Sequence, residues 1–206
     1  MNEEKTIDTY IADLRQRLAH NPGCAITHYN LGVALVNQRK WEEAISAFKK
    51  AAEESPSMAE AYINLGGIYF RQGNIEEAIA VNKKATEIRS DFAIPFGNLG
   101  YAHMIKGDLQ KAIEMLRKAV SKDGRYVQAY SNLGSAYLQM GELEESIACC
   151  KKALEISPDF GFAHNNLAIA YLEKKDFQRA IEHCDRAVKL GYEVDPGFLK
   201  KLEPHR

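Results

Sequence analysis

The most regularly spaced polar residues in the sequence are asparagines that recur every 34 residues. A primary amide carries two N–H donors and a carbonyl acceptor, so a row of amides can bond the backbone of an extended peptide whatever its side chains are. Asparagine also forms helices poorly, at a cost of roughly 0.6 kcal/mol relative to alanine, so helix propensity does not explain the row. The chemistry that this pattern favours is binding through hydrogen bonds. The residues are Asn30, Asn64, Asn98, Asn132 and Asn166.

Groups that could act as nucleophiles, acids or metal ligands are scattered along the chain. No phosphate-binding loop, nucleophile elbow or histidine-rich metal motif is present in the sequence. One group of soft ligands falls in phase on neighbouring predicted helices and could approach a metal; it consists of Cys149, Cys150, His183 and Cys184. Adjacent residues on a helix point about 100° apart, so the four side chains do not converge easily. Small buried cysteines are the favoured interpretation, and we expect no catalytic residue, metal, cofactor or enzymatic activity.

An internal repeat predicts the helices that carry these residues. Leu-Gly pairs stand at 31–32, 65–66, 99–100 and 133–134, and Leu167-Ala168 continues the series. Within each block the twentieth and twenty-seventh positions are small, and the seventeenth is large and apolar. A polar turn divides each block into two apolar-periodic segments, which predicts a pair of helices. The five blocks are 25–58, 59–92, 93–126, 127–160 and 161–194.

Such helix pairs cannot bury their apolar faces alone, so each block must stack on its neighbours. The segment 1–24 before the first block predicts a capping helix over residues 5–20. After the last block, Asp195-Pro196 predicts a helix start, and residues 195–206 are expected to cap the other end. We therefore predict one all-α solenoid domain over residues 1–206.

In its period and in these positions, the sequence resembles the tetratricopeptide repeat (TPR) family over residues 25–194. The resemblance implies antiparallel helix pairs stacked into a right-handed superhelical α-solenoid, with the first helix of each pair lining a concave face. It also implies that the asparagines, sixth in each block, lie on that face. Some superhelical relatives use such an asparagine ladder to hold a peptide, whereas elsewhere in the family this asparagine bonds a neighbouring helix. The sequence leaves both roles open.

The predicted groove wall is apolar and aromatic, with little charge. Gly67 and Gly97 remove side chains from its floor and leave room for a ligand beside Tyr101 and Phe70; the alternative is that these glycines serve only helix packing. Besides the five asparagines, the predicted peptide- or protein-binding residues are Tyr29, Gly67, Phe70, Arg71, Gly97, Tyr101, Ser131 and Ser135.

One use of the family fold is excluded by the residues at these positions. Relatives that clamp a C-terminal carboxylate carry lysine or arginine at the second, fifth and sixth positions. Here no lysine stands at the fifth position, and the second positions hold Ile26, Glu60, Ile94, Gln128 and Phe162. An apolar helix or an extended, weakly charged segment suits this groove better.

Composition and charge limit the partners and the cellular compartment that we expect for this chain. The chain has 27 basic and 28 acidic residues and a net charge of −1, which gives no electrostatic reason to expect nucleic acid or an anionic membrane as a partner. No stretch approaches the roughly 18 to 20 apolar residues that span a bilayer, and no apolar signal segment follows the polar start. Four cysteines in a chain of this length do not suggest a disulfide framework, so we expect a cytoplasmic protein without membrane insertion.

The second helices are predicted to begin acidic and end basic, as from Glu42-Glu43 to Lys49-Lys50 in the first block. Charges placed in this way complement the helix dipole, so we interpret them as structural. Together the patterns predict a non-catalytic scaffold or adaptor that binds a peptide or helix of a partner protein in its concave groove. The alternative is a self-assembling homo-oligomeric scaffold, in which the groove or the end helices make subunit contacts.

Overall fold

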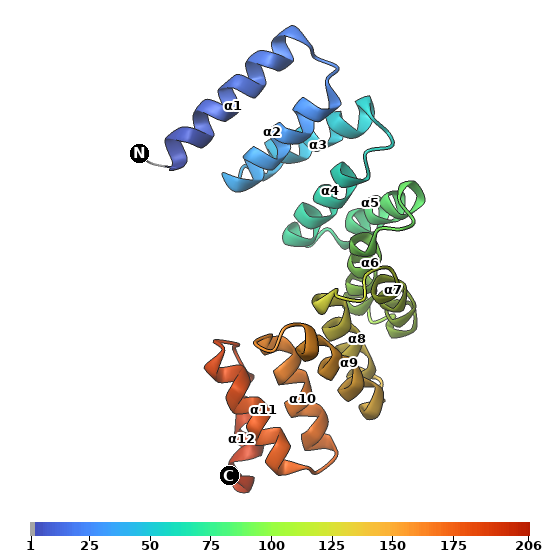
Figure 1. The fold of residues 1–206 in the computed structure, drawn as a ribbon, viewed down its shortest axis with the longest axis vertical. Helices are drawn as coiled ribbons and strands as arrows, with labels where there is room; N and C mark the ends of the chain where they lie inside the picture. The colour runs from blue at the N-terminus through green and yellow to red at the C-terminus, as the bar shows by residue number, and fades with distance from the viewer. Residues whose placement is uncertain (1–2) are drawn as a thin grey trace. The chain divides into compact units, whose positions relative to one another are not determined.

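A computed structural model describes residues 3–206, with side chains from Thr6 onward, and these residues form twelve α-helices and one short 3₁₀ helix without any strand (Figure 1). The prediction of an all-α fold is thereby confirmed. The helices are α1 (Glu3–His20), α2 (Ala25–Asn37), α3 (Trp41–Glu54), α4 (Ala59–Gln72), α5 (Ile75–Ile88), α6 (Ala93–Ile105), α7 (Leu109–Lys122), α8 (Val127–Gln139), α9 (Leu143–Ile156), α10 (Gly161–Glu173), α11 (Phe177–Lys189), α12 (Pro196–Leu202) and the 3₁₀ helix η1 (Glu203–His205).

The helices group into two compact units, which meet in the sequence between Asp91 and Phe92. The N-terminal unit holds α1–α5, and the C-terminal unit holds α6–α12. In the C-terminal unit the first helices of successive repeats, α6, α8 and α10, contact one another directly. That the whole chain acts as a single domain stays a prediction.

Each repeat consists of the predicted helix pair, in the predicted register. The first helices α2, α4, α6, α8 and α10 begin at the first residue of their blocks, and the second helices α3, α5, α7, α9 and α11 complete them. The two helices of each pair pack against each other. The 34-residue period therefore locates all ten helices of the repeats.

Glycine at the eighth position lets the two helices of a repeat approach closely. A Cβ on Gly32 would lie 2.7 Å from the ring of Phe48, and a Cβ on Gly100 would lie 2.5 Å from Leu116 Cγ. The same clash would occur at Gly134, where Cys150 is the neighbour. In each case the opposing side chain stands sixteen residues later, on the second helix, and is fully buried. The small residue is thus required by a large or buried partner across the helix pair.

The turn inside each repeat requires a residue with left-handed backbone. Gly73, Gly107 and Gly141 have φ values of 76°, 76° and 78° at the equivalent position. In the first and last repeats Arg39 (φ 57°) and Lys175 (φ 61°) take this conformation instead. Glycine adopts it without steric strain, whereas another residue incurs a cost of roughly 1–2 kcal/mol.

Both predicted capping segments are helical and seated on the adjacent repeat. On α1, Ile11 and Leu14 are 4% and 1% exposed and belong to the core of the N-terminal unit. At the other end the Asp195 carboxylate accepts a bond from the backbone N–H of Phe198 at 2.8 Å, which makes Asp195 the predicted N-cap of α12. Leu202 is fully buried in the core of the last repeat.

On the second helices α3, α5 and α9 the predicted acidic start is present, but the prediction that they end basic is wrong. Glu42 and Glu43 lie in the first turn of α3, as expected. Lys50 does not lie in the last turn, because the helix continues to Glu54, and its ammonium pairs with Glu53 Oε2 at 2.6 Å. The same pairing joins the corresponding lysines of α5 and α9 to glutamates one turn later, as Lys84–Glu87 and Lys152–Glu155. These exposed pairs contribute little to stability.

The longest described helix, α1, has 18 residues, many of them charged. Across residues 3–206, no helix combines the length and the hydropathy that crossing a bilayer requires.

Candidate protein-interaction site

The repeated asparagines all lie on first helices, but they make different bonds. Asn64 Nδ2 on α4 donates to the Glu60 carbonyl at 2.8 Å and lies 3.4 Å from the hydroxyl of Tyr29 on α2. Asn166 Nδ2 on α10 donates to the backbone oxygen of Ser131 on α8 at 3.2 Å. In both pairs the partner on the preceding first helix stands 35 residues earlier. In the second and fifth repeats the asparagine therefore ties successive first helices together, which is the packing role that the sequence left open.

The asparagine of the fourth repeat, Asn132, does not follow this bonding pattern. The residue 35 positions before Asn132 is Gly97, and in the described chain Asn132 makes no hydrogen bond to it. Asn132 instead accepts a bond from Gln128 Nε2, one turn earlier on α8, at 2.9 Å. The space beside Gly97 is taken by Tyr126, whose ring carbon Cε1 lies 2.7 Å from the place of a Cβ. At this atom the glycine therefore admits a tyrosine ring of the same chain, and its role in ligand binding stays a prediction.

An open pocket of about 400 Å³ lies beside Gly97 and Asn132. We call it the α6–α8 pocket. Its size falls within the range of sites that enclose a ligand or a protruding side chain. Four of its residues were predicted from the sequence: Gly97, Asn98, Tyr101 and Asn132. The full lining is Gly97, Asn98, Tyr101, Tyr126, Gln128, Asn132 and Phe162.

The walls of the α6–α8 pocket are aromatic and carry no formal charge. The ring of Phe162 stacks on that of Tyr192 with centroids 6.0 Å apart, and it meets Phe160 edge-on at 6.4 Å. Burial raises the pKa of Tyr126, and the charge of Asp123 adds to the effect, so its hydroxyl stays protonated at neutral pH. The pocket thus offers flat apolar surfaces and neutral hydrogen-bonding groups.

Comparison with known families assigns this arrangement of helices. Family models described as tetratricopeptide repeat match residues 11–59 and 29–91, and again 127–160 and 162–190, and one described as TPR repeat matches residues 100–141. The chain belongs to the tetratricopeptide repeat family. Members of the TPR family are typically non-catalytic interaction modules.

Solved TPR structures share the fold. A structure of MamA has a TM-score of 0.70 and 27% identity, covering 83% of this chain and 96% of that one. YrrB, described as a TPR protein with an unusual peptide-binding site, has a TM-score of 0.72 and 23% identity, covering 93% and 97%. A thermophilic TPR protein of Thermus thermophilus has a TM-score of 0.66 and 21% identity, covering 88% and 98%. No curated protein matches the sequence.

Three other predicted binding residues of this TPR chain take part in packing within the N-terminal unit. The rings of Tyr29 and Phe48 are in contact, with their centroids 5.7 Å apart. Arg71 places its guanidinium 4.6 Å from the centre of the Trp41 ring. Phe70 packs against the core of the unit. These contacts give each side chain a structural role, and their binding role stays a prediction.

Gly67 and Asn30 are the predicted residues of the N-terminal unit that face open space. A Cβ on Gly67 would meet no atom within 4 Å, so this glycine leaves the surface of α4 bare. Asn30 lines a small pocket of about 110 Å³ between α1 and α2, together with Tyr10 and Val33.

The two predicted serines do not line the α6–α8 pocket. Ser131 is fully buried, and within the described chain its hydroxyl has no hydrogen-bond partner. The sequence placed it on the groove wall, but α8 turns this side chain into the helix packing. Ser135 is half-buried one turn further along α8.

The cysteines and histidine that could have held a metal do not converge. Cys150 and Cys184 are fully buried, and burial raises the pKa of Cys150 to about 12 and that of Cys149 to about 11, which keeps both as thiols. His183 instead faces His164, with their Nδ1 atoms 2.9 Å apart. Among residues 6–206, no three His, Cys, Asp or Glu side chains gather in a way that could hold a metal ion.

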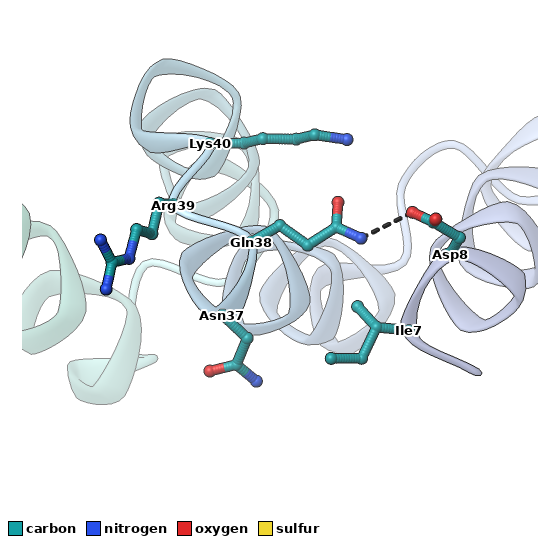
Figure 2. A pocket seen from close by; sticks show the side chains of 6 residues that line it. All are labelled: Ile7, Asp8, Asn37, Gln38, Arg39 and Lys40. Atoms are coloured by element: carbon teal, nitrogen blue, oxygen red, sulfur yellow. Dashed lines mark hydrogen bonds between the residues drawn. The ribbon is translucent and has the colours of Figure 1, made fainter. Parts of the chain in front are cut away.

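A second pocket, of about 450 Å³, forms where the capping helix α1 meets the turn between α2 and α3 (Figure 2). Figure 2 shows the amide of Gln38 directed at Asp8, to which its Nε2 donates at 2.6 Å, while Arg39 points away from both. No sequence signal identified this pocket, because α1 lies outside the repeats. Its rim is formed by long exposed side chains, including Lys40.

Proposed function

We propose that this TPR chain is a non-catalytic adaptor that holds a segment of a partner protein at the α6–α8 pocket. The observation that carries the proposal is the different bonding of Asn132, whose amide lines an open pocket instead of tying α8 to α6. A pocket with apolar walls and a few convergent polar groups is the usual form of a binding site. YrrB, which has the same fold, is described as having a peptide-binding site.

The surface next to the pocket extends the proposed site along α6. Ile94, Tyr101 and Ile105 are 46%, 45% and 49% exposed, and their spacing of seven and four residues puts them on one face of the helix. An exposed apolar row beside a neutral pocket favours an apolar helix or an extended, weakly charged segment over a charged one. The partner is therefore a protein, and neither nucleic acid nor a membrane is part of the proposal.

We place the protein in the cytoplasm. Cys24, Cys149, Cys150 and Cys184 are all free thiols. Free thiols persist in reducing compartments.

The proposal is tested by capture of partners from native extract on the full chain, followed by mass spectrometry. The variant Asn98→Ala with Asn132→Ala removes two amides from the pocket. The control, Asn21→Ala with Asn74→Ala, removes two exposed amides elsewhere. We expect a captured protein to be lost with the pocket variant and kept with the control, while both variants retain the helical circular dichroism of the parent. A partner that is captured equally by both variants would show that the pocket is not the site.

The self-assembling alternative predicts a different outcome. Both end helices already cover the terminal repeats of their own chain, with Leu14 and Leu202 buried, so they are not free to cap a second copy. A homo-oligomer that uses the groove would then form through the pocket or its surroundings. Light scattering that shows a concentration-dependent oligomer in the parent and a monomer in the pocket variant would replace the adaptor with this alternative.

A further inference from the structure

We infer that the α6–α8 pocket selects a tyrosine of the partner segment and bonds its hydroxyl to the amide pair of Gln128 and Asn132. This inference rests on the proposed function and specifies which side chain the pocket receives. It is carried by the hydrogen-bonding capacity of the amide pair, by the aromatic walls and by the absence of charge in the lining.

The amide pair keeps one carbonyl group and one amino group that are not bonded within the described protein. Gln128 Nε2 donates to Asn132 Oδ1 at 2.9 Å, and neither side chain makes another hydrogen bond in the described chain. The pair therefore keeps the Gln128 carbonyl and the Asn132 amino group available. If both amides were turned over, the bond would reverse and the pair would still keep one carbonyl and one amino group. A single bond between two amides always leaves this combination.

A phenol hydroxyl matches the combination because it both donates and accepts. An indole N–H only donates, and the rings of phenylalanine and the chain of leucine do neither, so each of these would leave a polar group of the pair unbonded. An unbonded polar group that has been removed from water costs free energy. The pair thereby discriminates by hydroxyl rather than by size.

The walls suit the ring of the same side chain. Phe162 is held in place by its stacking on Tyr192, and Tyr126 is held against Gly97. Tyr101 completes the lining and is 45% exposed. Aromatic pairs in offset or edge-on contact are favourable beyond the area that they bury, so an aromatic ring gains more here than an aliphatic chain does.

The lining also excludes charged side chains. Every residue of the pocket is neutral, and Tyr126 keeps its proton. Without a cation in the lining, a carboxylate or a phosphate would lose its hydration without compensation. Phosphorylation of the partner's tyrosine is therefore expected to abolish its binding.

The inference is tested on the full chain by NMR titration with three probes: p-cresol, toluene and p-cresyl phosphate. We expect p-cresol to shift the side-chain amide signals of Gln128 and Asn132 and to bind about thirtyfold more tightly than toluene, as two neutral hydrogen bonds imply. The phosphate ester is expected to give no saturable shift. Equal binding of p-cresol and toluene, or shifts that map to another surface, would overturn the inference.

A pair of matched variants on α8 completes the test. Gln128→Leu changes an exposed lining residue and is expected to reduce the preference for p-cresol over toluene to about fivefold, because Asn132 alone remains to bond the hydroxyl. Gln139→Leu makes the same change at the exposed end of α8 outside the pocket and is expected to leave the preference intact. A preference that is as large in Gln128→Leu as in the parent contradicts the role of the amide pair.

Selection of displayed random peptides on the full chain separates this inference from the proposed function. Peptides that share a tyrosine, and that bind Gln128→Leu more weakly than the parent, support both. Peptides without tyrosine that are lost with the Asn98→Ala and Asn132→Ala variant overturn the tyrosine and keep the adaptor. Peptides that bind both of these variants as well as the parent overturn the adaptor, while the p-cresol titration still reports on the chemistry of the pocket.

Discussion

The first helices of the fourth and fifth repeats carry the same asparagine in the same position, and only one of the two bonds the preceding helix. Asn166 donates to the backbone of Ser131, whereas Asn132 is held by Gln128 on its own helix. The residue one turn earlier differs between the two repeats. Gln128 can bond an amide, and its counterpart in the fifth repeat, Phe162, cannot. A repeated residue thus takes its role from its neighbours rather than from its position alone.

The two glycines that were predicted to open the groove make a parallel comparison. Gly97 has a tyrosine ring against it, and Gly67 has nothing within 4 Å. One glycine is required by packing and the other is not.

The largest difference is expected between Gly97→Ala and Gly67→Ala. A methyl group on residue 97 would lie 2.7 Å from the ring of Tyr126 and force it to move, so this variant should lose about 1–3 kcal/mol of unfolding free energy. At residue 67 the methyl group meets open space, and the better helix propensity of alanine should add up to about 1 kcal/mol. Urea unfolding followed by circular dichroism measures both. Equal effects of the two substitutions would show that Tyr126 does not depend on Gly97.

Next in size is the difference between Asn166→Ala and Asn132→Ala. Asn166 is 3% exposed and joins two helices, so its loss should destabilise the protein by about 1–3 kcal/mol. Asn132 bonds only to an exposed glutamine, which can turn to water, so its loss should cost about 1 kcal/mol or less. The same unfolding experiment applies. A larger cost for Asn132→Ala would mean that its amide ties helices after all, and the pocket would lose its distinguishing feature.

In the fifth repeat a pair of histidines also joins the two helices, and the fourth repeat has no histidine at the equivalent positions. His164 and His183 meet where the fourth repeat has Tyr130 and Cys149. His164 Nε2 lies 3.0 Å from the Pro158 carbonyl, which only accepts, so Nε2 carries a proton. In the neutral ring Nδ1 then accepts from His183 Nδ1–H.

This histidine pair predicts a pH-dependent stability. Burial lowers the pKa of His183 below its ordinary value of 6.5, and His164, Lys151 and Arg179 lower it further, against an opposing effect of Glu182. The unfolded chain therefore binds more protons than the folded one as the pH falls through 6.5, and stability decreases with it. We expect the urea midpoint to fall more between about pH 7.5 and about pH 5.5 in the parent than in His183→Gln. An equal fall in the two proteins would locate the proton uptake elsewhere.

The smallest effect is expected for Ser131→Ala. The backbone oxygen that accepts from Asn166 is kept, and a buried hydroxyl without a partner is removed. Loss of an unsatisfied group, together with the better helix propensity of alanine, should stabilise the protein by about 1 kcal/mol or less. Partner capture should be unchanged, because the side chain does not reach the pocket. Reduced capture would restore Ser131 to the binding site.

The helices and their pairing could be predicted from the amino-acid sequence. Every repeat helix lies within its predicted block, because the apolar period and the small residues at fixed positions admit only one way for the two helices to pack. The capping helices followed from the same reasoning, since Asp195 supplies an N-cap and Leu14 continues the apolar phase. Four of the seven residues that line the α6–α8 pocket were also predicted, because position in the repeat selects the exposed side of the first helix.

Which of these residues face open space could not be predicted, because it depends on contacts between helices. Tyr126 stands at the end of a block, where no rule of the repeat indicates that its ring fills the space beside Gly97. Ser131 and Asn132 are neighbours in a predicted binding row, yet one is turned into the packing and the other lines the pocket. Such outcomes depend on the shapes of side chains that meet across helices, and those contacts join residues about one repeat apart. A 34-residue period describes what the repeats share, whereas the pocket arises from what one repeat does not share with the next.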